Sequence, residues 1–324
     1  MTAIANLPDI RPSLLLDFAN TGRVDPRIQC TRASAATCYG PDGKLRTVAA
    51  NVPRIDYDPV TGKCLGLLVE EPRTNLWLNS ATAVTQSFAV TAQTYTLSFE
   101  GSGSIALTGA YSGDSSAGTV KSGRRVLTFT PSAGSLTCTP SGDVRNVQFE
   151  AGAFPTSYIP TEASAATRAA DAPYLSGTIP GFDPDRGTLI VSYDYPSDRV
   201  SNMVPLSLDA GTQTNSIALA SSVAGTDRFL VQAGGVGVFN SGFSPFTTGT
   251  RKTSGIAFGA GRISTSSEGR AAVTVTGVAM PVGLNRITLG HSGYFGQSRS
   301  NGHIARLAYY PVPVIDSQLQ RLTT

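Results

Sequence analysis

Hydrophobic and polar residues alternate with a period of two through the middle of the chain. Between about residues 90 and 160 short runs of five to seven residues show this alternation, and Gly-Ser clusters separate them. A period of two places successive side chains on opposite faces of a β-strand. The pattern predicts a small antiparallel sandwich or jelly roll, with Tyr95, Leu97 and Phe99 on one face. The further apolar positions of this pattern are Ile105, Leu107, Val126, Leu127, Phe129, Leu136, Val144, Val147 and Phe149.

A third block follows Ala172 and contains clearer strand signals. The alternation at Leu189, Val191 and Tyr193 predicts strands with one buried and one solvated face, as in two packed sheets. In Tyr309-Tyr310, only one of the two rings is expected at the surface. The segment IDSQLQRL is the best helix of the chain, with Asp316-Ser317 as its expected N-cap. Eight strands are predicted here: GTLIVSYDY, MVPLSLD, NSIALAS, RFLVQAG, KTSGIAFGAG, AAVTVTG, RITLGHS and HIARLAYYP.

The first 80 residues alternate short apolar runs with turn signals. Asp42-Gly43 and Thr61-Gly62 predict two hairpins, and the strand at residues 67–69 is expected to end at Pro72. The fold class is therefore all-β, with antiparallel jelly-roll-like sandwiches in tandem after an irregular hairpin module. The expected boundaries are a hairpin attachment module at 1–83, a small jelly roll at 84–165, a linker at 166–174 and a larger sandwich at 175–324.

Composition supports this class and excludes others. The 324 residues contain 6 Glu and 4 Lys but 34 Gly and 20 Pro, so long helices and helical bundles are excluded. A net charge of +3 is too small for a surface that follows nucleic-acid phosphates. The chain has no apolar run of 18 residues, and its start lacks the features of a signal peptide. We therefore expect synthesis in the cytoplasm without membrane insertion.

The four cysteines match no zinc-binding or disulfide-rich spacing. Cys30, Cys38, Cys64 and Cys138 are expected to be reduced, buried thiols. A bridge between Cys30 and Cys38, or from either to Cys64, is the alternative in an oxidising compartment.

Three strings of sequence carry a family resemblance. The string TRASAATCYGPDGKLRTVAANVPRIDYDPVTGKCLGLLVEEPRTNLWLNS (31–80) resembles the opening of phage head-spike or tail fibre proteins, including the head spike fibres of gene transfer agents. VRNVQFEAGAFPTSYIPTEASAATRAAD (144–171) resembles the close of their carbohydrate-binding-like jelly roll. NGHIARLAYYPVPVIDSQLQRLT (301–323) is similar to the end of a concanavalin A-like or laminin-G-like sandwich.

The resemblance implies a structural spike or fibre subunit of a phage or phage-like particle that binds host surface or capsular polysaccharide for adsorption. It implies a homo-oligomer, with five copies at a capsid vertex or three or six at a tail, attached to a spike base, capsid or tail protein. Its location would be the particle surface, after synthesis in the host cytoplasm and release by lysis. The alternatives are a capsule polysaccharide depolymerase and a purely structural capsid decoration protein.

The loop GHSGYFGQSRSNGH combines aromatic rings with planar polar groups, which glycan recognition requires. An equally weighted alternative is that its two aromatic rings close the end of the sandwich. The predicted carbohydrate contacts are His291, Tyr294, Phe295, Gln297, Arg299 and Asn301.

An apolar cluster at Leu14, Leu15, Leu16 and Phe18 has two interpretations, a particle anchor or the start of the first core. Trp77, between Leu76 and Leu78, is expected in packing or at a subunit interface.

No catalytic residues are predicted, so the chain is expected not to be an enzyme. Only His291 and His303 are available as imidazoles, both expected at the surface, and the GxSxG, HExxH and GxxxxGK[ST] motifs are absent. The neighbours Glu70 and Glu71 point to opposite faces of a strand and cannot pair as a glycosidase requires. A depolymerase would need carboxylates that converge across sheets, for which the candidates are Glu100, Glu150 and Asp209.

No cofactor or metal is predicted. Asp183 and Asp185, or Asp194 and Asp198, offer oxygen ligands that Ca²⁺ could use. The favoured interpretation is that these side chains cap turns of their own backbone.

Overall fold

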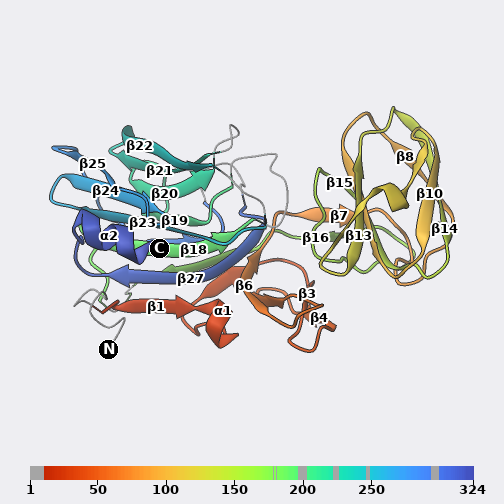
Figure 1. Cartoon of the computed structure of the whole chain (residues 1–324), viewed down its shortest axis with the longest axis horizontal. Helices are drawn as coiled ribbons and strands as arrows, with labels where there is room; N and C mark the ends of the chain where they lie inside the picture. Colours follow the sequence, from red (N-terminus) through yellow and green to blue (C-terminus); the bar gives the residue numbers. More distant parts are fainter. Residues whose placement is uncertain are drawn as a thin grey trace.

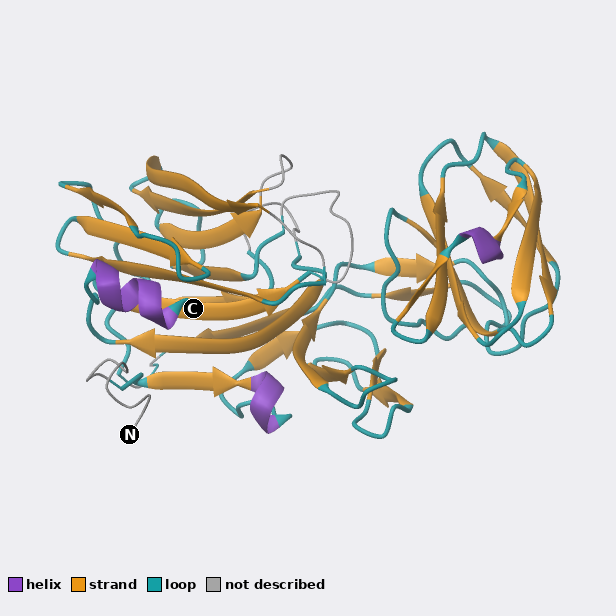
Figure 2. Cartoon of the chain, in the orientation of Figure 1, coloured by secondary structure: helices purple, strands orange, loops and turns teal. Residues whose placement is uncertain are grey.

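The computed structural model describes residues 11–177, 179, 181–195, 203–221, 226–245, 249–292 and 299–324. Over these residues the chain forms two β-sandwiches of unequal size that lie side by side and are joined by a narrow pair of strands (Figure 1). Strands dominate and the helices are short (Figure 2). The predicted all-β, antiparallel sandwich class is confirmed.

The larger sandwich contains an eight-stranded antiparallel sheet, sheet A. Seven of its strands follow in the order β25 (Val273–Thr276), β24 (Arg262–Ser267), β23 (Lys252–Gly259), β18 (Gly187–Asp194), β27 (Gly302–Tyr310), β6 (Cys64–Val69) and β5 (Arg54–Tyr57). The eighth, β1 (Leu14–Asp17), pairs with the second half of β27, whose first half pairs with β6. Both ends of the chain therefore build the same sheet.

The opposing sheet, sheet B, also combines distant segments. Its seven strands are β2 (Gln29–Thr31), β17 (Ala172–Ser176), β26 (Arg286–Leu289), β19 (Leu206–Asp209), β20 (Ser216–Ser221), β21 (Thr226–Ala233) and β22 (Val236–Pro245), in spatial order. The core of the sandwich lies between the sheets and includes the predicted inward residues Leu189, Val191 and Tyr193, each 0% exposed.

The smaller sandwich consists of two four-stranded sheets. One contains β11 (Gly113–Asp114), β10 (Ser104–Gly109), β14 (Gly134–Ser141) and β8 (Gln86–Val90), and the other β12 (Thr119–Lys121), β13 (Arg124–Phe129), β9 (Tyr95–Glu100) and β15 (Arg145–Ala151). The 3₁₀ helix η1 (Ser115–Ala117) lies before β12. The predicted inward residues Leu97, Phe99 and Ile105 are fully buried, and Trp77 is packed in the same core.

A two-stranded neck connects the sandwiches. It pairs β7 (Arg73–Asn75) with β16 (Ala166–Arg168), so the chain enters and leaves the smaller sandwich at one place (Figure 1). The smaller sandwich is thus an insertion between two parts of the larger one. Residues 166–174, expected as a linker, contribute to two strands, β16 and the start of β17.

The N-terminal residues are part of the larger sandwich and not a separate module. The two predicted hairpins are present, one between β3 (Ala36–Tyr39) and β4 (Leu45–Val48) and the other between β5 and β6. Gly43 and Gly62 adopt positive φ at their turns, as their sequence context predicts. However, β1, β2, β5 and β6 pair with strands of the C-terminal half, so the expected boundary near residue 83 does not separate a domain. Sequence could not show this because the pairing partners lie at the far end of the chain.

The structure also corrects the attachment interpretation of the apolar cluster at its start. Leu14, Leu16 and Phe18 are at most 2% exposed and belong to the core of the larger sandwich, which was the alternative interpretation. Only Leu15, at 45% exposure, faces outward. β1 continues directly into the single-turn helix α1 (Phe18–Thr21), whose first turn is capped by the Asp17 side chain.

The C-terminal helix α2 (Asp316–Leu322) packs on the outer face of sheet A. The sequence pattern predicted a solvated face there. Ile190, Ala308 and Leu319 form a second apolar layer there. Tyr309 and Tyr310 are consequently both buried, because one faces the sandwich core and the other the helix side. Asp316 is not the N-cap. It is the first helical residue, and Ile315 precedes it without a side-chain cap.

The sequence pattern did not predict three strands of the segment after residue 171, namely β17, β22 and β24. β24 reads RISTSS, yet Ser264, Thr265 and Ser266 are buried, so its polar side chains are packed although they look solvated in the sequence.

All four cysteines lie within the described residues and are free thiols, three of them buried and Cys64 half-buried. Among the described residues, no helix has the length and apolar character needed to span a membrane.

Candidate functional site

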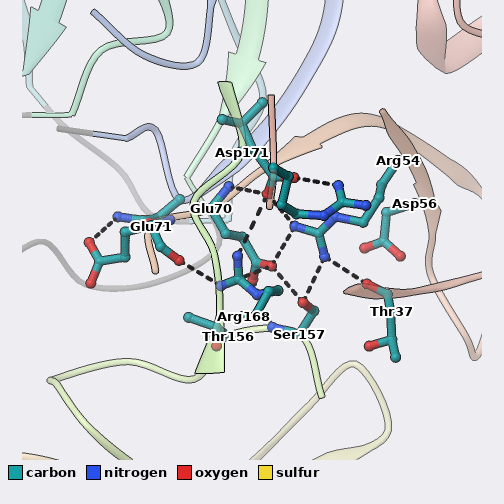
Figure 3. Close-up of polar contacts among 12 residues, drawn as sticks. Thr37, Arg54, Asp56, Glu70, Glu71, Thr156, Ser157, Arg168 and Asp171 are labelled. Atoms are coloured by element: carbon teal, nitrogen blue, oxygen red, sulfur yellow. Dashed lines mark hydrogen bonds and ion pairs between the residues drawn. The ribbon is translucent and has the colours of Figure 1, made fainter. Parts of the chain in front are cut away.

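Five buried charged side chains meet where the neck leaves the larger sandwich (Figure 3). Asp171 is at the centre. Its Oδ1 accepts a hydrogen bond from Arg32 Nη1 at 2.8 Å, and its Oδ2 accepts from Arg54 Nη2 and from the backbone N–H of Glu70. None of the five side chains is more than 8% exposed. We call this cluster the ionic junction; its members are Arg32, Arg54, Glu70, Arg168 and Asp171.

The ionic junction extends into the smaller sandwich through Ser157. The Ser157 backbone N–H and hydroxyl donate to the Glu70 carboxylate at 2.7 and 2.6 Å, and Arg54 Nη1 donates to the Ser157 hydroxyl at 2.8 Å (Figure 3). Arg54 Nη1 also donates to the Thr37 carbonyl at 2.7 Å. One guanidinium therefore ties a strand of the larger sandwich to the β3–β4 hairpin and to the inserted domain.

Pairing opposes the effect of burial on the pKa values of Glu70 and Arg54. Burial alone would raise the pKa of Glu70, but Arg168 and Arg54 outweigh it and lower that pKa to about 2. Burial would likewise lower the pKa of Arg54, and the carboxylates of Asp171 and Glu70 raise it instead. For Arg168, burial prevails and lowers its pKa. With its pKa this low, the Glu70 carboxylate is unsuited to proton transfer near neutral pH.

Sequence reasoning missed the ionic junction, although two signals for it were present. The similar segments TRAS (31–34) and TRAA (167–170) each contain one arginine. These arginines, Arg32 and Arg168, both form ion pairs with Asp171 in the structure. The pair Glu70-Glu71 diverges as expected: Glu70 enters the junction, and Glu71 accepts from Asn301 Nδ2 at 2.8 Å.

The three carboxylates considered for a depolymerase, Glu100, Glu150 and Asp209, do not converge on one site. Each one bonds to a different set of neighbours. Glu100 accepts from Tyr39 and Asn146, whereas Glu150 accepts from Gln148 and Thr156, and burial raises the pKa of Glu150. Glu100 lies on β9, and Glu150 on β15 pairs with Thr96 of β9, which is about 13 Å from Glu100 along the strand at the usual rise. Asp209 lies in the other sandwich and pairs with Arg286.

Both histidines are buried, which corrects the expectation that they lie at the surface. His303 lies between two carboxylates, with Nδ1 2.8 Å from Asp194 Oδ1 and Nε2 3.1 Å from Asp56 Oδ2. Burial opposes its protonation, but the two carboxylates, Asp194 first, raise the pKa of His303 to about 10. His303 is therefore a cation that ties β27 to β5 and β18.

The predicted carbohydrate loop is described only at its two ends. Tyr294, Phe295 and Gln297 lie outside the described residues. His291 Nε2 lies 3.1 Å from the Pro173 carbonyl, and burial lowers the pKa of His291 to about 3.

At the other end of the loop, Arg299 donates to the Asp171 carbonyl at 2.6 Å and Asn301 Oδ1 accepts from the Glu71 backbone at 2.8 Å. His291, Arg299 and Asn301 are thus buried and bonded within the chain. Their glycan contact stays a prediction.

An open groove is lined mainly by residues of β21 and β22, the last two strands at one edge of sheet B; Figure 1 shows these strands at the top of the larger sandwich. Along β21, Phe229 and Val231 face the core, whereas Leu230 and Gln232 are half-buried on the opposite face. The volume of the groove is about 400 Å³. We call it the amide groove, after the amides in its lining, which includes Gln213, Gln232, Asn240, Leu230 and Val238.

The aspartates considered for calcium have protein partners. Asp183 accepts from the Asp185 backbone at 3.0 Å and from Arg186 at 2.9 Å, which is the favoured turn-capping arrangement. Asp194 pairs with His303 and Arg251, and Asp198 lies outside the described residues. Within the described part of the chain, no group of three or more His, Cys, Asp or Glu side chains is placed to hold a metal ion.

Comparison with known proteins finds distant structural similarity to carbohydrate-binding β-sandwich domains. No family model matches the sequence, and no curated protein matches it. One similar structure is the Ruminococcus gnavus IT-sialidase CBM40 bound to α2,3-sialyllactose, with 18% identity, a TM-score of 0.36, and 43% of this chain and 83% of that chain covered.

Two further similar structures have comparable scores. Domain 4 of AbnA, an extracellular arabinanase from Geobacillus stearothermophilus in complex with arabinotriose, has 13% identity, a TM-score of 0.39, and coverage of 53% and 82%. A putative carbohydrate binding protein from Bacteroides ovatus has 11% identity, a TM-score of 0.32, and coverage of 77% and 84%.

Proposed function

We propose that this chain is a polysaccharide-binding spike or fibre subunit of a phage or phage-like particle, and that the amide groove holds the glycan. The amide groove is the observation that carries the proposal. The amides of Gln213, Gln232 and Asn240 can each donate and accept, as sugar hydroxyls require. Leu230 and Val238 offer apolar surface for the C–H faces of a sugar ring.

The size of the groove fits this role. A volume of about 400 Å³ lies within the range of roughly 300–1,000 Å³ typical of ligand sites. Its lining comes from two neighbouring strands and from Gln213, which precedes β20. The particle assignment is supported by the resemblance of residues 31–80 and 144–171 to phage spike and fibre proteins.

Binding at one groove would be weak, and copy number would compensate for it. Several identical subunits on one particle convert later contacts into intramolecular ones, which raises avidity by about 10²–10⁴. We therefore propose a homo-oligomer on the particle surface, joined to a spike base, capsid or tail protein.

The test compares binding of purified protein to capsular polysaccharide. Gln232→Ala and Asn240→Ala are expected to weaken binding, whereas Gln318→Ala on α2, at sheet A, is the matched control and should not. Equal binding by all variants would contradict the proposal. Shortening of the polymer during incubation would instead favour the depolymerase.

A particle experiment distinguishes the third candidate. Particles that lack this chain are expected to adsorb poorly to capsulated cells. Their adsorption to acapsular cells should equal that of complete particles. Normal adsorption to capsulated cells would indicate a purely structural decoration protein.

A further inference from the structure

A lysine and an aspartate face each other inside the larger sandwich. The Nζ of Lys252 lies 3.7 Å from Oδ2 of Asp227, and the two side chains are 2% and 0% exposed. Lys252 is the first residue of β23 in sheet A, and Asp227 is the second residue of β21 in sheet B. These two side chains, which we call the buried Lys–Asp pair, therefore span the space between the two sheets.

Strand periodicity directs both side chains of the pair inward. On β21, Asp227 alternates in step with Phe229 and Val231, which belong to the core of the larger sandwich. On β23, Lys252 shares a face with Ile256, which belongs to the same core. Removing an ammonium and a carboxylate from water is costly, and their attraction repays this cost only when the geometry is close. A neutral bond between the two groups would avoid the cost.

The geometry of the pair suits a reaction better than it suits a strong ion pair. Charge-assisted N–H···O bonds usually measure about 2.7–2.9 Å, and the distance from Lys252 to Asp227 is longer. The Tyr193 hydroxyl donates to Oδ2 of Asp227 at 2.7 Å, and the Tyr195 hydroxyl lies 3.5 Å from Oδ1. Hydrogen-bond donors at the carboxyl oxygens stabilise the negative charge that develops there when an amine attacks the carbon.

Tyr193 keeps the proton that it donates. Burial first, and then the Asp227 carboxylate, raises the pKa of Tyr193 well above its ordinary value. The Tyr193 hydroxyl also lies 3.2 Å from the Ser254 hydroxyl, which is 2.9 Å from that of Ser267. The phenol is therefore held in place and stays neutral, so it can polarise the Asp227 carboxyl throughout a reaction at its carbon.

We propose that Lys252 and Asp227 join in an intramolecular isopeptide bond that fastens β23 to β21. One proton passes from the ammonium to Oδ2, and the nitrogen lone pair forms a bond to Cγ. The bond from Cγ to Oδ2 then breaks with its electron pair on the oxygen, which takes a second proton from the nitrogen and leaves as water. An ammonium and a carboxylate thus become an amide and water, and no oxidant or other reagent is needed.

The fold supplies what this reaction needs. The flexible stem of lysine can close the remaining distance to the carboxyl carbon. Groups held together in one molecule reach effective concentrations of about 10⁵–10⁸ M. The bond would stabilise the sandwich as a cross-link does, by restricting the unfolded chain. This inference goes beyond the proposed function, because it concerns a covalent bond in the core and not the binding of a ligand.

The experiment measures the intact mass of the full chain after denaturation. The unaltered protein is expected to be lighter than its sequence by one water molecule. Digestion with trypsin should then yield peptide 200–228 joined to peptide 252–262, because trypsin does not cleave after a lysine whose side chain is in an amide bond. A protein at its full sequence mass, without the joined peptides, would overturn the inference.

Two matched pairs of variants assign the bond. Lys252→Met should show its full sequence mass, whereas Lys63→Met, at an exposed lysine, should keep the loss of water. Tyr193→Phe retains both reacting groups and is expected to lower the joined fraction severalfold in protein purified in the same way. Tyr309→Phe, at another buried tyrosine of this sandwich, should leave that fraction unchanged.

The variants also provide the contrary outcomes. Loss of water in Lys252→Met would place the reaction at another residue and overturn the inference. An unchanged joined fraction in Tyr193→Phe would overturn the role of Tyr193.

Discussion

The two sandwiches are built in opposite ways. The smaller one is continuous, and the residues between the two strands of the neck supply all eight of its sheet strands. The larger one is discontinuous, since β1 from the start of the chain pairs with β27 near its end. Local pattern specifies the smaller domain, whereas long-range pairing and the ionic junction complete the larger one. We therefore expect the two domains to respond differently to mutation.

The largest expected effect comes from the ionic junction. Asp171→Ala leaves Arg32 and Arg54 buried without their central partner, and breaking a buried ion pair costs about 3–5 kcal/mol of the free energy of unfolding. Urea denaturation followed by far-UV circular dichroism measures the whole chain. The fluorescence of Trp77, the single tryptophan, reports the smaller sandwich. The circular dichroism transition should shift more than the fluorescence transition.

Asp143→Ala is the control for that comparison. Asp143 pairs with Arg145 at the surface of the smaller sandwich, where both side chains are at least 50% exposed, so little change is expected. Equal shifts of both signals in Asp171→Ala would show that the two sandwiches unfold as one cooperative unit.

Matched core truncations test the same separation from both sides. Leu97→Ala in the smaller sandwich and Leu189→Ala in the larger one each remove a fully buried side chain, at a cost of about 2–5 kcal/mol. Leu97→Ala is expected to lower the fluorescence midpoint strongly. Leu189→Ala should affect mainly the circular dichroism transition, and a reversed response would contradict the assignment of the two cores.

The two histidines, both in the larger sandwich, predict opposite pH effects on stability. The folded pKa of His303 is raised to about 10, so its contribution is full below about pH 6.5 and is lost as the pH rises through 10. The folded pKa of His291 is lowered to about 3, so its burial destabilises the protein as the pH falls below about 6.5.

Unfolding measured from pH 4 to 10 tests each histidine separately. His303→Leu should cost about 2–3 kcal/mol near neutral pH, from the lost bonds to two carboxylates, and should remove the alkaline decline. His291→Leu should reduce the acid decline. A pH profile that neither substitution alters would exclude both effects.

The smallest expected effect is at the exterior of the larger sandwich. Asp316 accepts from Arg262 at 2.5 Å, but both side chains are at least 30% exposed. Asp316→Ala is therefore expected to cost at most about 1 kcal/mol. Thermal unfolding at low and high salt checks this, because the cost should decrease as salt screens the pair. A larger loss that salt does not change would indicate that Asp316 acts mainly through its bond to Thr274.

Much of the fold could be predicted from the sequence, and little of the candidate site. The alternation at Leu97 and Phe99 and the turns at Gly43 and Gly62 were sufficient for the smaller sandwich and the two hairpins. The polar strand β24 was missed because its serines and threonine are buried by tertiary contacts, as in the bond between Ser266 and Thr323, the C-cap residue of α2. The amide groove was missed because it combines residues from separate strands and from Gln213, which lies outside them.

By itself, the sequence determined that the chain is all-β, where most strands and turns lie, and which residues of the regular period-two strands face a core. Those properties depend on period-two patterning and on turn residues, both of which act over a few neighbouring positions. Only the tertiary structure decided that residues 11–75 complete the C-terminal sandwich and that Asp171 is shared by two distant arginines. Strand partners and buried ion pairs are selected by the free energy of the whole packed fold, and no local pattern records that selection.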